Sequence, residues 1–256
     1  LVRPIEDMLQ VGAKAGQVDE ASAMRFRFDL SGALDLDSIY EQAMAQLRQR
    51  PVDSRLLMPL SSSLGPQACD GLREPLRRMG LVPVSSPAVL PTAGAARSFE
   101  QGGVLAVVLC GGDISLAATG TVTEIRGDQL YGFGHAFDGP GATHLPIAAG
   151  IVHAVVANRN SSFKFSSPGP ILGTLEFDQS FAVRGTIGAE PTTIPLRIAV
   201  DRYNAPSVRT YDCYAASDRT YTPLVLQLAV NGAALVQGAL PPEHTVRYEA
   251  RVGIAG

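Results

Sequence analysis

Beyond residue 103, short apolar runs alternate with Gly, Pro and Asp, and this pattern is the strongest constraint on the fold. A continuous apolar run covers 104–110, and an alternating run at 119–126 is followed by an Arg-Gly-Asp turn that leads into 129–133. A glycine-containing turn between two such runs predicts a β-hairpin. Many short strands separated by turn residues favour an antiparallel barrel or sandwich.

The same signals predict the other elements of the C-terminal part. Strands are expected at 171–177, 181–185, 193–200, 208–214 and 245–254, and a helix at 222–235. The fold class predicted for the whole chain is therefore α+β and β-rich, an antiparallel barrel or sandwich of short strands with a few packed helices.

The first hundred residues have a different sequence pattern, which indicates mixed and partly helical structure. Expected there are a helical turn at 5–10, a strand at 24–30, an amphipathic helix at 37–50 and, within a proline-rich stretch, a helix at 67–79. This change in sequence pattern predicts a boundary between an N-terminal region, 1–100, and a β-rich domain, 101–256.

Composition excludes several classes of function. Lys and Arg number 21 and Asp and Glu 24, a net charge of −3, so the chain lacks the basic excess of nucleic-acid-binding proteins. Its apolar runs are shorter than the ~18 residues of a membrane-spanning helix. No phosphate-loop or dinucleotide motif is present, and we expect neither a cofactor, nor nucleic acid, nor a membrane span. The three cysteines lack zinc spacing and are expected to be buried thiols.

His135 is the candidate catalytic residue. It follows the expected hairpin in the sequence Tyr-Gly-Phe-Gly-His-Ala-Phe at 131–137. A histidine held at the end of a strand suits general-base chemistry, because a base must lie within about 3 Å of the proton that it removes. A hydrogen-bonded structural histidine beside a glycine turn remains the commoner interpretation of such spacing. His144, His153 and His244 are interpreted as structural.

Two other groups of residues are weaker candidates for a functional site. In the segment 161–169 the hydroxyls beside Lys164 could form a serine–lysine pair, although strand alternation would instead turn Phe163 and Phe165 inward and the lysine outward. A metal site, and with it a metal-dependent hydrolase, would need His135, Asp138, His144 and His153 together, at a spacing that matches no recurrent pattern. We assign no metal.

Several segments together resemble the SpoIVB-type serine peptidases. They are Gly-Asp-Ile-Ser at 112–115, Thr-Gly-Thr-Val-Thr at 119–123, Gly-Phe-Gly-His at 132–135, the stretch 161–169, Gly-Thr-Leu at 173–175 and Gly-Thr-Ile-Gly at 185–188. Pro-Ile-Glu-Asp-Met-Leu at 4–9 is also similar to a segment of the long, non-sporulation members. The resemblance covers about residues 100 to 200 and is spread over these segments.

The resemblance implies a chymotrypsin-like fold and makes His135 the general base of a Ser-His-Asp-type triad. The family's nucleophile lies in a Gly-x-Ser-Gly-Ser-Pro motif that this sequence lacks. In the long members that motif precedes the Pro-Ile-Glu-Asp-Met-Leu segment, so the serine is expected on a segment ahead of Leu1. The triad acid is expected to accompany the serine and is not assigned here. Ala136 replaces the family's usual proline.

Two hypotheses follow. The first is a part of a SpoIVB-like serine endopeptidase of the bacterial cell envelope or secreted space, acting on a peptide or protein substrate. It would be inactive alone and completed by an N-terminal serine-bearing segment of the same precursor. The second is a non-catalytic cell-envelope scaffold or protein-binding module built on the same fold.

Overall fold

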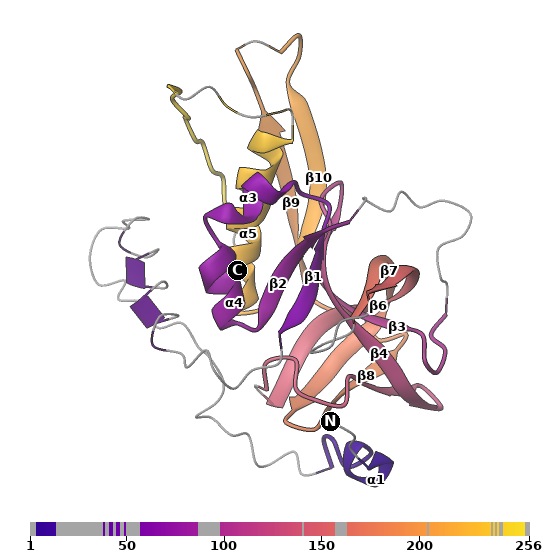
Figure 1. Cartoon of the computed structure of the whole chain (residues 1–256). Coiled ribbons are helices and arrows are strands. Elements are labelled where there is room, and N and C mark those ends of the chain that lie inside the picture. The colour runs from indigo at the N-terminus through magenta and orange to yellow at the C-terminus, as the bar shows by residue number, and fades with distance from the viewer. Residues whose placement is uncertain are drawn as a thin grey trace.

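A computed structural model describes residues 4–13, 57–86, 98–139, 141–156, 163–203, 205–236, 238, 240 and 243–253, and residues 38, 41, 42, 45, 46 and 49. Within these residues ten strands form one mostly antiparallel sheet in the order β2-β1-β4-β5-β8-β7-β6-β3-β10-β9 (Figure 1). The parallel pair is β1 with β2.

The strands are β1 (Met58–Ser62), β2 (Leu81–Ser85), β3 (Val104–Gly112), β4 (Leu116–Arg126), β5 (Gln129–Gly132), β6 (Gly141–Val156), β7 (Phe163–Gln179), β8 (Ala182–Ile187), β9 (Thr193–Val200) and β10 (Arg209–Ala216). The helices are α1 (Ile5–Met8), α3 (Pro66–Asp70), α4 (Arg73–Arg78) and α5 (Tyr221–Leu235).

Six of the strands close into a ring, because β4 and β3 also pair with each other. The ring runs β4-β5-β8-β7-β6-β3, and it is not a true barrel. Its ladder between β3 and β6 has only two residue pairs, Ala106 with Ala148 and Val107 with Ile147. The sheet then continues outward, from β4 to β1 and β2 and from β3 to β10 and β9.

β3 is buried on both faces. Successive side chains of a strand point to opposite faces, so its apolar run supplies two separate clusters. The main core takes one set, Leu105, Val107 and Leu109, and a smaller cluster takes the other, Val104, Ala106 and Val108. A strand covered on both sides has no polar positions, which explains the continuous apolar run.

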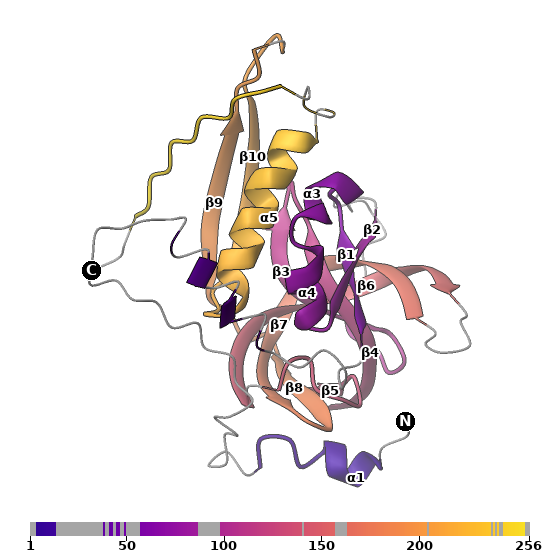
Figure 2. The ribbon, with the colours of Figure 1, turned by 60° about the vertical axis from the view of Figure 1, so that its left-hand side comes forward.

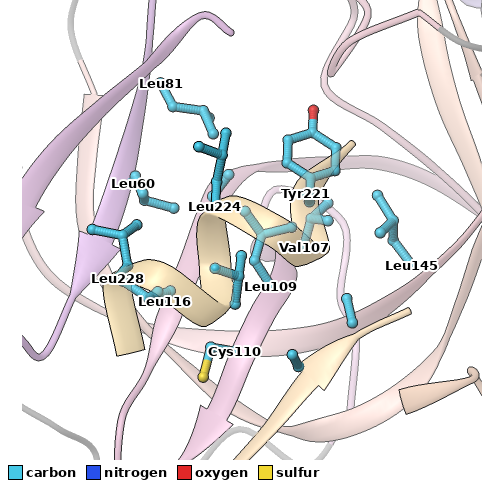
Figure 3. Packing of buried hydrophobic residues seen from close by; sticks show 14 of the residues in the cluster. Leu60, Leu81, Val107, Leu109, Cys110, Leu116, Leu145, Tyr221, Leu224 and Leu228 are labelled. Atoms are coloured by element: carbon cyan, nitrogen blue, oxygen red, sulfur yellow. The ribbon is translucent and has the colours of Figure 1, made fainter. Parts of the chain in front are cut away.

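α5 covers the main core on one side of the sheet. Its buried Tyr221, Leu224, Val225 and Leu228 recur at helical spacing. The helix contacts β3, β9 and β10 on one flank and α3 on the other, and Figure 2 shows it between the β9–β10 hairpin and α3 and α4. Figure 3 shows Tyr221, Leu224 and Leu228 among the core leucines of the sheet.

The β-rich, mostly antiparallel fold with few helices is confirmed. So are the β4–β5 hairpin, with its turn at Gly127 and Asp128, and the strands expected at 104–110, 171–177, 181–185, 193–200 and 208–214. The helices expected at 5–10 and 222–235 are α1 and α5. The expected strand at 24–30, and most of the helix at 37–50, lie outside the described residues.

Two expected elements are wrong. The single helix at 67–79 is two short helices, because α3 ends at Asp70, where the Leu72 N–H bonds to the Cys69 carbonyl at 3.1 Å in a tight turn. No strand forms at 245–253. Every side chain of that segment is exposed, and an alternating pattern cannot make a strand without a neighbouring ladder.

Three strands were not expected, namely β1, β2 and β6. β6 pairs with β7 through several register shifts, including one between Val152 and Ala154. Each shift inserts an unpaired residue and interrupts the two-residue alternation from which a strand is predicted. β1 and β2 are only five residues long and contain Pro59 and Pro83.

Other expectations concern cysteines, membranes and domains. All three cysteines are free and buried, as predicted. In the described ranges no helix is both long and apolar enough to span a membrane. β1 and β2 share the sheet with the strands that follow residue 103, and the division into 1–100 and 101–256 stays a prediction.

Truncating the core at β3 should destabilise the whole sheet. Leu105 is fully buried and lies against Gly132 of β5. Leu105→Ala should lower the free energy of unfolding by about 2–5 kcal/mol in urea titrations. The matched control is Val208→Ala, because Val208 is 54% exposed. It should change stability by less than about 0.5 kcal/mol, and equal effects of the two variants would contradict this core.

Candidate functional site

His135 lies just after β5, where the backbone makes an unusual turn. Phe133 has φ of +69° and Gly134 has φ of +73°. A positive φ is uncommon for a phenylalanine and must be held by its surroundings. The Phe133 N–H donates to the Thr121 carbonyl at 3.0 Å, and the Phe133 ring occupies the space that a side chain on Gly120 would fill. Gly120 and Gly134 together allow this turn.

Within the described residues the His135 imidazole makes one hydrogen bond, at 2.7 Å, between Nδ1 and the carbonyl oxygen of Ala136. A carbonyl oxygen can only accept, so Nδ1 carries the proton. In the neutral ring Nε2 is then the acceptor nitrogen, the protonation state that a general base requires. Ala136 supplies this contact through its backbone.

Aromatic rings connect His135 to the core. Its ring centroid lies 5.6 Å from that of Phe133, with 31° between the planes. Phe133 is 6.2 Å from Phe137, and Phe137 is 5.3 Å from Tyr221 at the start of α5. Contacts of this kind restrict side-chain motion, so the half-buried imidazole is supported on one side by packed rings.

The loop after His135 is held by one buried carboxylate. Asp178, near the end of β7, accepts the N–H of Phe137 at 2.7 Å, of Asp138 at 2.6 Å and of Gly139 at 2.7 Å. Burial raises the pKa of Asp178 to about 6, and the three N–H groups oppose that rise without cancelling it. Nothing in the sequence marked Asp178, because 40 residues separate it from Asp138.

Within the described residues, no hydroxyl group hydrogen-bonds to His135. The imidazole can therefore accept a proton from a group brought to it, and the described chain supplies no nucleophile at that position. Asp138 is buried in the same loop, and its backbone N–H donates to the Asp178 carboxylate at 2.6 Å.

A second imidazole does meet hydroxyl groups. His153 Nε2 lies 2.8 Å from Ser167 Oγ, which lies 2.8 Å from Ser86 Oγ. This chain joins β6, β7 and the residue after β2, and Ser167 is 1% exposed. Sequence reasoning placed His153 in an apolar run and missed the contact, which the pairing of β6 with β7 creates. A serine so enclosed is suited to a structural bond, and the structural role of His153 stays a prediction.

Within the described residues Lys164 bonds to no serine hydroxyl, and Ser161 and Ser162 lie outside them. Its Nζ donates to the carbonyls of Gly102 at 2.6 Å and Gly103 at 3.4 Å, and partial burial lowers its pKa. In the described part of the chain, no three His, Cys, Asp or Glu side chains are grouped to hold a metal ion. His144 and His244 are exposed, on β6 and in the C-terminal segment.

Comparisons with known proteins identify no relative. No protein-family model matches the chain, and neither a curated protein nor a solved structure matches it.

The hydrogen bond to Ala136 makes a spectroscopic prediction. In the neutral state His135 should carry its proton on Nδ1, visible in long-range ¹⁵N–¹H correlation spectra above neutral pH. His144 is the reference, because it is exposed and has no hydrogen bond within the described residues. A His135 ring protonated on Nε2 would contradict the geometry.

The buried carboxylate should make stability depend on pH. The folded state binds the Asp178 proton more tightly than the unfolded chain does, so this stabilisation is complete below about pH 4 and is lost as the pH rises through about 6. This shift in the pKa of Asp178 corresponds to about 3 kcal/mol in the free energy of unfolding. Urea titrations over this range should show wild type losing stability relative to Asp178→Asn. Parallel pH curves for the two proteins would contradict the raised pKa.

Proposed function

We propose that this chain is the histidine-bearing part of a SpoIVB-like serine endopeptidase, with His135 as its general base. The serine nucleophile would lie on a segment outside this chain, and the substrate would be a peptide or protein. One observation carries the proposal: the Ala136 carbonyl fixes the proton on Nδ1, so the neutral His135 ring presents Nε2 as an acceptor.

The proposed chemistry follows from that tautomer. Nε2 would take the proton of the serine hydroxyl as the serine oxygen attacks the peptide carbonyl, and would then deliver it to the leaving amine. During this step the ring carries a positive charge. In this chain the Ala136 carbonyl accepts from Nδ1, the position at which the acid of a Ser-His-Asp triad accepts. No residue of this chain is assigned as the triad acid.

The chymotrypsin-like assignment of the fold belongs to the same proposal. The six-strand ring supports it, because antiparallel strands closed on themselves bring loops such as 133–139 to an end of the ring. The location in the bacterial cell envelope or secreted space rests on the resemblance of the motifs alone. So does the proposed partner, a serine-bearing segment of the same precursor.

A second candidate is a non-catalytic envelope scaffold or protein-binding module. The observation that favours it is that, in the described residues, His135 bonds to a backbone carbonyl and to no hydroxyl. A histidine so placed also serves to close a turn. The two candidates differ in one property, whether removing the imidazole abolishes a reaction.

The test uses a longer polypeptide in which a Gly-x-Ser-Gly-Ser-Pro segment precedes this chain. His135→Ala should lower its peptide cleavage or self-cleavage by about a thousandfold or more, because the serine loses its base. The matched control is His144→Ala, at an exposed histidine on β6, which should cleave at the wild-type rate.

Thermal unfolding of both variants separates loss of the base from loss of the fold. A folded His135→Ala protein that cleaves normally would refute the role of His135. A longer wild-type protein that folds and never cleaves would favour the scaffold.

A further inference from the structure

Three consecutive backbone N–H groups converge on one side chain directly after the candidate base. They belong to Phe137, Asp138 and Gly139, and their acceptors are the two carboxylate oxygens of Asp178, at 2.6–2.7 Å. These distances are short, as expected for bonds to a charged acceptor. One side chain of β7 thus fixes the backbone of a whole turn whose first residue is two positions beyond His135.

Only an ionised carboxylate fits this arrangement well. It has two oxygens that accept and no donor, whereas an amide of the same size has one accepting oxygen and an NH2 group that would face an N–H. Asp178 is 1% exposed, so water cannot replace the lost acceptor. Burying a charged carboxylate costs free energy, and the hydrogen bonds from the three N–H groups offset part of that cost.

The bond that sets the His135 tautomer depends on the same turn. Its acceptor is the carbonyl of Ala136, and that carbonyl belongs to the peptide group whose N–H, on Phe137, is held by Asp178. The two bonds therefore act on opposite ends of one planar unit. Rotating this peptide would break the bond to Asp178 and move the carbonyl away from Nδ1 together.

We propose that Asp178 is a positioning residue for His135, which it orients through the peptide group between Ala136 and Phe137. The orientation follows from the geometry of this chain alone. Its catalytic consequence rests on the proposed function, in which a correctly oriented Nε2 accepts the serine proton.

Among the residues that the structure describes, no cationic side chain forms an ion pair with Asp178. The facing ionisable group in the loop is Asp138, whose negative charge opposes ionisation of Asp178. The neighbouring strands place Gly141 of β6 and Val183 of β8 opposite it.

The next residue of β8, Arg184, lies over the ring of Phe177, with its guanidinium carbon 4.3 Å from the ring centroid. α1 packs on Ala182 of the same strand through Met8, and its Glu6 and Asp7 are exposed. The hydrogen bonds to the loop are therefore the interactions that favour the charged form.

The test is Asp178→Asn in this chain, compared with Thr174→Val. Thr174 is equally buried on the same strand, and its hydroxyl donates to the Ala189 carbonyl at 3.0 Å, away from the His135 loop. Both variants lose a buried hydrogen bond and should be destabilised. Only Asp178→Asn should release the proton of His135 from Nδ1 and speed amide exchange at 137–139 by about tenfold or more.

A measurement on the wild-type chain covers the case in which Asp178→Asn does not fold. The amide proton resonances of Phe137, Asp138 and Gly139 should titrate together with one midpoint near pH 6, the pKa of their common acceptor. The amide of Gly134, which bonds to the Gly132 carbonyl, is the internal control. Three amides that do not titrate with Asp178 would overturn the proposal.

A folded Asp178→Asn variant with an unchanged His135 tautomer would also overturn it. These spectra need no catalysis, so they separate this proposal from the proposed function. If Asp178→Asn shifts the tautomer while His135→Ala leaves cleavage intact in the longer polypeptide, Asp178 orients a histidine that is not a base.

Discussion

The pairing of β3 with β4 is the interaction on which the rest of the structure depends. It closes six strands into a ring, and β3 carries β10, and through it β9, on the outside of that ring. The side chains of β3 supply both the main core and the second cluster, because the strand is covered on both faces. α5 then seals the main core against β3 (Figure 3). The His135 loop connects two strands of this ring, since β5 precedes the loop and β6 follows it.

Two different kinds of interaction hold the candidate site, aromatic packing and hydrogen bonds to a buried carboxylate. The Phe133 ring packs against one side of the histidine, and Phe137 and Tyr221 continue that row of rings to α5. Asp178 holds the following peptide groups by directional bonds that exist fully only when it is charged. The burial that makes these bonds strong also makes that charge costly, which is why the Asp178 pKa is raised to about 6. We therefore expect a rise in pH through about 6 to strengthen the orientation of the imidazole and to lower the free energy of unfolding.

Local patterns predicted the parts of this structure that local physics determines. Gly127 in a tight turn predicted the β4–β5 hairpin, and the helix predicted at 222–235 is α5, whose buried residues recur at helical spacing. The long β6 escaped prediction because its bulges break the alternation. For the site, the glycines around Phe133 pointed to His135 at the end of a strand, whereas the contacts of Asp178 and of His153 depend on strands meeting from far along the chain. No pattern within one segment encodes such contacts, and the role of His135 stays a proposal.

The most direct test of that role is intact mass spectrometry of a native preparation before and after a fluorophosphonate, a probe that labels an activated serine. We expect no label on this chain alone. When a serine-bearing segment is present with it, we expect one label on that segment, and we expect His135→Ala to abolish this label. A label on a serine of this chain would contradict the account by placing the nucleophile within it. A serine-bearing segment that stays unlabelled beside the folded wild-type chain would contradict it as well.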